Sequence, residues 1–331
     1  MTVTILVGDV REQLRKIPDA HFDCAVTSPP YWGLRDYGVA GQIGLEATVG
    51  EHMAVMVNVF REVRRVLKPQ ATLWLNYGDC YATTPNGRAA EDVVNDDRTF
   101  RDKPFSTIGG VFKPKDLCML PNRLAIALQE DGWWVRSEIV WNKTNPKPES
   151  VFDRPASVHE KIWLLTKSDE YFFDVEAIKE PVTGGAHARR KDGQYKPAKG
   201  STKGQNREGT WVETYVPEMR NPRNVWTFNI EGYRGAHFAT FPRALAERCL
   251  RAGVPMTTCG ACGAASDCGG LCSAFQRTPG RVLDPFGGSG TVGVVAEALG
   301  LDSTLIELNP EYAEMARQRI YGAPVEEGAA A

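Results

Sequence analysis

Several features that would place this chain outside the ordinary globular proteins are missing from its sequence. No stretch approaches the roughly 18 consecutive apolar residues of a transmembrane helix, and the first residues lack the basic start and apolar run of a signal peptide. We therefore expect a cytoplasmic protein with no membrane association. Eight cysteines in 331 residues are too few for a disulfide scaffold. With 42% hydrophobic and 24% charged residues, the composition excludes collagen-like, coiled-coil and wholly disordered chains.

The net charge is only −2, so the overall balance does not indicate a nucleic-acid-binding protein. Residues 184–207, however, hold seven Lys or Arg and one Asp, and they carry no Val, Ile, Leu, Met, Phe or Trp. Such a segment cannot build a core, and we expect it to be mobile when free. Taken one at a time, these cations fit a solvated loop. Taken together, they suit contacts with DNA phosphates, and the segment would become ordered when DNA binds. The candidates are Arg189, Arg190, Lys191, Lys196, Lys199, Lys203 and Arg207.

Short apolar runs alternate with stretches of helical spacing, which predicts an α/β fold with a mainly parallel sheet. A polar stretch, residues 83–112, is expected to be a long surface loop, and Pro69 is expected to end a helix. Strands are predicted at residues 4–7, 22–26, 72–75, 133–141, 161–165, 281–283 and 303–307. Helices are predicted at residues 10–17, 53–67, 122–130, 242–251 and 291–299 and from residue 310.

One motif is a strand that runs into a glycine-rich turn and a helix, Leu283 to Thr291. Glycines let a backbone approach a ligand closely and let the helix N-terminus face it. About 20 residues after the turn, Glu307 ends the next strand, where an acid can accept both hydroxyls of a ribose. The spacing is neither G-x-G-x-x-G nor a P-loop. The arrangement predicts a nucleoside-binding half-sheet, and the alternative is an ordinary tight turn with an exposed Glu.

A second motif, Thr27-Ser28-Pro29-Pro30-Tyr31-Trp32, follows a predicted strand. The prolines stop the strand, so nearby carbonyls lack strand partners and can point at a ligand. A hydroxyl, a fixed carbonyl and an aromatic face fit a planar ring that bears an amine. The alternative is a proline turn with a Tyr packed in the core.

Together the stretches Thr27–Trp32, Asp284–Thr291 and Ile306–Tyr312 resemble the DNA amino-methyltransferases, which transfer a methyl group from S-adenosylmethionine (SAM) to cytosine N4 or adenine N6. Because the Ser-Pro-Pro-Tyr element precedes the glycine-rich element, the order resembles the permuted beta group of these enzymes. The resemblance implies a permuted Rossmann-like fold with a mainly parallel doubly wound sheet. It also implies three parts: catalytic residues 1–182, a basic target-recognition region 183–234 and a SAM-binding part 235–331.

The resemblance also assigns roles to residues. Ser28, Pro29, Pro30 and Tyr31 would hold a target base that is flipped out of the duplex, with Tyr31 stacked on it. Asp9 would contact the adenine of SAM, although Asp is equally favoured there as a helix N-cap. The remaining implied cofactor residues are Phe241, Asp284, Pro285, Phe286, Gly288, Gly290, Thr291 and Glu307.

Ser before Pro-Pro-Tyr favours cytosine N4, with adenine N6 as the alternative. Methylation of RNA or of a protein glutamine is a weaker alternative, and so is a DNA-binding module without catalysis, which would require a broken SAM site. Double-stranded DNA is the expected partner. A homodimer and a cognate restriction endonuclease, as in restriction-modification systems, are further candidates.

A cysteine cluster lies between the helix near residue 250 and the predicted SAM strand. Cys259, Cys262, Cys268 and Cys272 could wrap a tetrahedral Zn²⁺ as a structural clip. The alternatives are unligated thiols on a glycine-rich loop and a redox pair.

Overall fold

The computed structural model describes residues 2–84, 105–182, 189–190, 203–205, 211–215, 218–232, 239–240, 242–264, 272 and 277–322. They fall into two compact units. One comprises residues 1–173 together with 224–331, and the other comprises residues 174–223. Most of the predicted loop 83–112 lies outside the described residues. No helix in the described ranges is long and apolar enough to cross a membrane.

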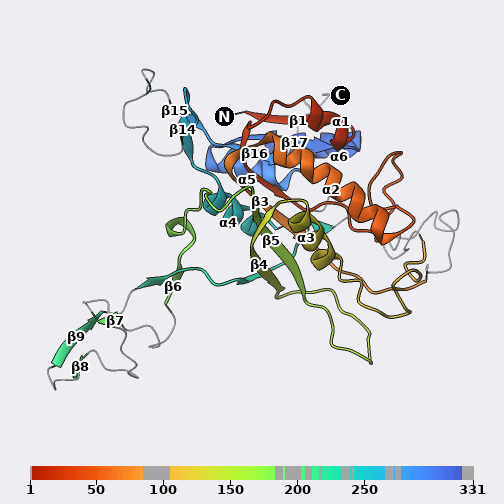
Figure 1. Ribbon diagram of the computed structural model, residues 1–331, viewed down its shortest axis with the longest axis horizontal. Coiled ribbons are helices and arrows are strands. Elements are labelled where there is room, and N and C mark those ends of the chain that lie inside the picture. Colours follow the sequence, from red (N-terminus) through yellow and green to blue (C-terminus); the bar gives the residue numbers. More distant parts are fainter. Residues whose placement is uncertain are drawn as a thin grey trace, which may run out of the picture. The chain divides into compact units, whose positions relative to one another are not determined.

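The larger unit is built on an eight-stranded sheet with the order β1-β17-β16-β2-β3-β5-β4-β11. All neighbouring pairs are parallel except the two that involve β5, so β5 alone runs against the others. Figure 1 shows the blue strands β16 and β17 beside the red β1, which brings the two ends of the sequence together in one sheet. The strands are β1 (Val3–Val7), β2 (Phe22–Thr27), β3 (Leu67–Tyr77), β4 (Trp134–Lys143), β5 (His159–Thr166), β11 (Val225–Phe228), β16 (Arg281–Asp284) and β17 (Asp302–Glu307).

Helices cover both faces of this sheet. Side chains alternate along β3, so Thr72 and Trp74 point to one face and Tyr77 to the other. Gly253, at the end of α4, approaches Thr72 and Trp74, whereas His52 of α2 contacts Tyr77. α1, α2 and α3 contact one another in sequence, as do α4, α5 and α6. The helices are α1 (Val10–Arg15), α2 (Val49–Val66), α3 (Leu120–Glu130), α4 (Arg243–Gly253), α5 (Thr291–Leu299) and α6 (Pro310–Tyr321).

This architecture confirms the predicted doubly wound, mainly parallel α/β fold. One boundary was wrong, because α2 ends at Val66 and Pro69 lies inside β3. The register between β2 and β3 shifts between Phe22 and Cys24, which leaves Pro69 in an irregular stretch. A proline can occupy such a bulge because no ladder hydrogen bond requires its missing N–H.

The smaller unit contains short strands and one short 3₁₀ helix, Glu176–Ile178. β6 (Glu180–Pro181) pairs with β10 (Met219–Arg220), and β9 (Trp211–Tyr215) lies between β7 (Arg189–Arg190) and β8 (Lys203–Gln205). The basic segment therefore supplies two strands of a three-stranded sheet, a pairing that its composition did not predict. The larger unit also holds two short antiparallel pairs, β12 (Glu231–Gly232) with β13 (Ala239–Thr240) and β14 (Thr257–Cys259) with β15 (Arg277–Pro279).

Candidate active site

Both predicted motifs line a single cavity of about 320 Å³ in the larger unit. Parallel strands end at the same edge of a sheet, and the strand order places the ends of β1, β17, β16 and β2 side by side there. Ser28 and Tyr31 therefore meet Asp284 and Glu307, although more than 250 residues separate the two motifs in sequence.

Asp284 ends β16 with its carboxylate buried. Its Oδ1 accepts a hydrogen bond from Thr27 Oγ1 at 2.7 Å and one from the Phe286 N–H at 3.1 Å. Burial raises the pKa of Asp284 to about 7, against the stabilising effect of these donors. The carboxyl group is thus held in place but is costly to ionise without a cation near it.

Glu307 ends β17, next to Asp284, and is fixed by backbone amides. The Gly288 N–H donates to one carboxylate oxygen at 2.7 Å and the Asn309 N–H donates to the other at 2.9 Å. Burial raises the pKa of this carboxyl group as well. Gly288 adopts a φ of +49°, and a Cβ there would meet little except the Phe286 carbonyl, 3.9 Å away. The turn therefore leaves an open backbone surface in front of the acid.

Asp9 is the N-cap of α1 and also lines the cavity. Its carboxylate accepts from the Arg11 N–H at 2.7 Å and forms an ion pair with the Arg11 guanidinium. The hydrogen bond from the Arg11 side chain lowers the pKa of Asp9 despite partial burial. The two interpretations of Asp9 are thus compatible, because the cap stands at the wall of the cavity.

The other predicted cofactor residues fall into three groups. Pro285, Phe286 and Thr291 line the cavity. Gly290 is not among the lining residues; it is the N-cap of α5 with a φ of +78°, where a Cβ would lie 2.8 Å from that of Ala316. Phe241 lies outside the described residues.

A second part of the cavity lining, here named the acceptor end, comprises Ser28, Pro29, Pro30 and Tyr31, which follow β2. The Ser28 Oγ lies 3.3 Å from the Tyr31 hydroxyl, which donates to Glu160 Oε2 at 2.9 Å. Burial, with the adjacent Glu160 carboxylate, raises the pKa of Tyr31 well above its usual value. The phenol is therefore neutral and serves as a donor.

Glu160 joins three strands at this end. Its Oε2 also accepts from Asn76 Nδ2 at 2.9 Å, and its Oε1 forms an ion pair with Lys143. Asn76, Trp141, Lys143 and Glu160 all line the cavity. The sequence analysis missed them, although Asn76 and Lys143 stand at or near strand ends that it predicted. Glu160 is the second residue of β5, and the reversed direction of that strand brings it to this edge.

A second contact set fixes the Tyr31 ring. Tyr77 packs against it edge to face with ring centroids 4.9 Å apart, and the Tyr77 hydroxyl lies 2.6 Å from His52 Nε2. His52 in turn contacts Glu46 at 2.8 Å through Nδ1. A Cβ on Gly78 would lie 2.4 Å from Cε2 of Tyr31, so the ring needs a glycine there. Tyr31 thus has little freedom to move.

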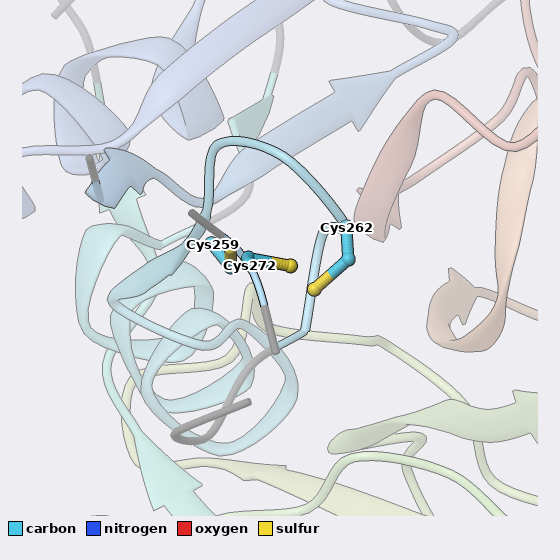
Figure 2. Close-up of side chains that lie close together, drawn as sticks. All are labelled: Cys259, Cys262 and Cys272. Carbon is cyan, nitrogen blue, oxygen red and sulfur yellow. The ribbon is translucent and has the colours of Figure 1, made fainter. Parts of the chain in front are cut away.

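The remaining predicted residues are the basic segment and the cysteine cluster, and the described cysteines Cys259, Cys262 and Cys272 do not line this cavity. Arg189 and Arg190 form β7 and Lys203 begins β8, whereas Lys191, Lys196, Lys199 and Arg207 lie outside the described residues. Cys259, Cys262 and Cys272 come together, with their sulfur atoms all within 4.8 Å of one another (Figure 2). Cys268 is also outside the described part.

Known proteins of similar sequence include DNA methylases. Residues 22–318 match the N6_N4_Mtase family, described as DNA methylase. The Type II methyltransferase M.SmaI of Serratia marcescens is 42% identical over 318 residues, which cover 96% of this chain and 90% of that protein. M.XycI of Xanthomonas campestris pv. cyanopsidis is 41% identical over 320 residues, covering 96% and 88%.

Two solved structures share the fold. The PvuII DNA methyltransferase, titled cytosine-N4-specific, matches with a TM-score of 0.61 at 17% identity, covering 99% of this chain and 89% of that one. A DNA modification methylase from Thermus thermophilus, solved with SAM, matches with a TM-score of 0.52 at 23% identity, covering 97% and 95%. The chain therefore belongs to the N6_N4_Mtase family of DNA methylases.

Proposed function

We propose that this protein is a DNA (cytosine-N4)-methyltransferase that acts on a base flipped out of the duplex. The observation that carries the proposal is the shared cavity, which Ser28 lines together with the two acidic residues Asp284 and Glu307. Ser in this position, before Pro-Pro-Tyr, favours cytosine N4 over adenine N6 in the resemblance described above.

The residues at the carboxylate end fit SAM. Asp284 is a buried acid whose donors are a hydroxyl and a backbone amide, and it suits the ammonium of the methionine part. Each carboxylate oxygen of Glu307 accepts one backbone N–H and can accept a further hydrogen bond, so this residue suits the ribose hydroxyls. Phe286 and Phe241 would supply apolar walls, Asp9 would contact the adenine, and the backbone from Pro285 through Gly288 and Gly290 to Thr291 would shape the turn.

An exocyclic amine is a poor nucleophile because its lone pair is delocalised into the ring. The Ser28 Oγ and the Pro29 carbonyl accept its two N–H bonds, which favours a pyramidal nitrogen with its lone pair turned toward the cofactor. SAM, when bound, supplies an electrophilic methyl group on a sulfonium. Alignment by this chain then accounts for much of the rate, and the nitrogen needs no strong base before transfer because it becomes acidic afterwards.

Tyr31 offers its ring to the target base, and Glu160 is a positioning residue that holds the Tyr31 hydroxyl. A base inside a duplex cannot reach the cavity, so flipping costs a few kcal/mol that DNA contacts must offset. We assign those contacts to the basic residues of 184–207, including Arg189, Arg190 and Lys203 on β7 and β8.

The relatives named Type II methyltransferases support a place in restriction-modification. We propose that the protein acts on double-stranded DNA and protects the sites of a cognate endonuclease, with a homodimer as the candidate assembly.

The test is to incubate the purified protein with SAM and unmethylated duplex DNA, digest the DNA to nucleosides and analyse them by mass spectrometry. N4-methylcytosine is the expected product, and the Ser28→Ala variant should give much less of it. N6-methyladenine would overturn the choice of base. Absence of both products from a protein that still binds SAM would overturn DNA as the substrate.

A further inference from the structure

We propose that Cys259, Cys262 and Cys272 hold a structural Zn²⁺ ion that fixes the hairpin leading into the SAM-binding strand. These residues lie outside the methyl-transfer cavity, so the metal site and the proposed function can fail independently.

The distances between the three sulfur atoms suit a shared ion. All lie within 4.8 Å of one another, and Figure 2 shows the sulfurs of Cys262 and Cys272 facing each other. Thiolates around tetrahedral zinc, with Zn–S bonds of about 2.3 Å, stand about 3.8 Å apart. A closure of roughly 1 Å therefore converts this cluster into a coordination shell, and side-chain rotation can supply it.

The backbone around the first two cysteines forms a closed turn. The Gly263 N–H donates to the Cys259 carbonyl at 2.8 Å, and the Cys259 N–H donates to the Ala264 carbonyl at 2.8 Å. Gly263 adopts a φ of +74°, a conformation that favours glycine. This turn presents the two thiols of a C-x₂-C pair on the same side of the chain, which is the ligand spacing common in structural zinc sites.

The kinds of ligand select the metal. The three residues are all thiols, with no carboxylate or imidazole among them, and soft sulfur ligands prefer zinc over magnesium, calcium or manganese. A disulfide could join only two of the three. Cys268, the fourth cysteine of the cluster in the sequence, lies outside the described residues, so we name only the other three as ligands.

The surroundings suit a negatively charged metal–thiolate centre. The Lys68 Nζ lies 3.7 Å from the point where a Cβ on Gly263 would stand. Lys68 also pairs with Asp23 at 2.6 Å, and the Asp23 carboxylate accepts from the Arg281 N–H at 2.9 Å. The cysteine turn is thus linked through two charged side chains to the first residue of β16.

The position in the chain indicates what the ion would do. Cys259 ends β14 and pairs with Arg277 of β15, and only Gly280 separates β15 from β16. An ion shared by Cys259, Cys262 and Cys272 closes the connection between the hairpin strands just before the strand that carries Asp284. We infer a clip that limits fraying of this hairpin, with no part in methyl transfer.

The test is to purify the full-length protein under reducing conditions from zinc-containing medium, exchange it into metal-free buffer and measure bound zinc by mass spectrometry. We expect one ion per chain in the wild type and at least a tenfold loss in Cys262→Ser. Cys262 is exposed, so this substitution removes a ligand without opening the core. Cys80→Ser is the matched control, because Cys80 is a partly exposed thiol outside the cluster. This variant protein should keep its zinc.

Cobalt gives a second, independent readout. After removal of zinc with a chelator, Co²⁺ should produce a thiolate-to-cobalt charge-transfer band in the wild type and in Cys80→Ser but not in Cys262→Ser. Reduced wild-type protein that is folded, binds SAM and yet holds almost no zinc and gives no cobalt band would overturn the proposal. An unchanged metal content in Cys262→Ser would overturn it as well.

Discussion

The two ends of the cavity are built in different ways. At the cofactor end, Glu307 is held by the amides of Gly288 and Asn309, and Asp284 accepts from the amide two residues on. At the acceptor end, Tyr31 depends on the side chain of Glu160, which is 129 residues away in sequence. One end is therefore fixed mainly by backbone groups at strand ends, and the other by a network of side chains.

The two ends of the cavity also differ in how their acidic side chains are paired with cations. Asp284 is buried and Glu307 is partly buried, and desolvation raises both of their pKa values, so the proposed cofactor end favours a cation. At the acceptor end, Glu160 already has its cation in Lys143. This contrast fits the roles that we propose, with a positively charged cofactor at the first end and a neutral base at the second.

The largest effect is expected from Tyr31→Ala. Removing the ring deletes the proposed stacking surface and the contact with Ser28, so methylation should fall by more than about 100-fold, in line with the loss of a positioning group in an aligned reaction. SAM affinity should stay within about threefold, because Tyr31 lies at the acceptor end, away from the glycine-rich turn. Tyr31→Phe, which keeps the ring, is the control. Calorimetry that showed loss of SAM binding in folded Tyr31→Ala would contradict the assignment.

Asp284→Asn should weaken SAM binding by about 10- to 100-fold, because it removes a charged hydrogen bond worth about 1.5–3 kcal/mol. The same change should not lower the melting temperature of the ligand-free protein, since burial disfavours the ionised acid. Calorimetry and thermal denaturation check the two halves of this prediction. Unchanged SAM affinity would place the ammonium elsewhere.

Glu160→Gln should lower kcat by about tenfold, which is the effect of one charged hydrogen bond, with little change in SAM affinity. The variant keeps the volume of the side chain but removes the charge that Lys143 pairs with. Glu138→Gln is the matched control, because Glu138 pairs with Lys161 at 2.6 Å in a more exposed position. Equal losses in both variants would mean that Glu160 serves only the stability of the sheet.

The pH dependence of SAM binding should follow Asp284. With its pKa raised to about 7 by burial, the group is mostly protonated at pH 6 and mostly ionised at pH 8. SAM affinity should therefore rise about tenfold between these values, and Asp284→Asn should lose most of this rise. The stability of the ligand-free protein should have the opposite pH dependence. Because burial raises the pKa of Asp284 in the folded state, its contribution to the free energy of unfolding falls as pH increases from about 4 to 7. A flat binding profile would contradict the assigned role.

The smallest effect is expected from reversing the charges of Arg189, Arg190 and Lys191. For each phosphate contact that is lost, DNA binding should weaken several-fold at moderate salt, and the slope of log Kd against log salt should flatten by about 0.9. SAM affinity should not change, because the proposal assigns these residues to DNA phosphates and not to the cofactor. An identical salt slope, measured by fluorescence anisotropy, would show that this segment does not touch phosphates.

The sequence could indicate that Asp284 and Glu307 line one cavity because the determinants of this part are local. The strand, the glycine turn, the helix and the acid at the end of the next strand stand within about 25 residues. The acceptor end was only half predicted. Ser28 to Tyr31 could be read from one short motif, whereas Glu160 reaches the cavity only because β5 runs against its neighbours. Periodicity predicts that a strand exists but does not give its direction.

Other differences have the same origin in tertiary context. β11 places Trp226 in the core beside Trp74, yet its four residues are too short for a reliable period. Arg189 and Arg190 lie on a strand because β9 supplies a partner, which no composition argument could foresee. The roles of the site residues, the boundaries of the three parts and the zinc ion remain predictions.

The division of the cavity is tested most directly by the single-turnover methylation rate of Asp284→Asn and Glu160→Gln, measured with SAM at saturation. If one end binds the donor and the other positions the acceptor, Asp284→Asn should recover most of the wild-type rate as SAM saturates, while Glu160→Gln should stay slow. A Glu160→Gln enzyme restored by excess SAM, or an Asp284→Asn enzyme that stays slow when fully loaded, would contradict the account.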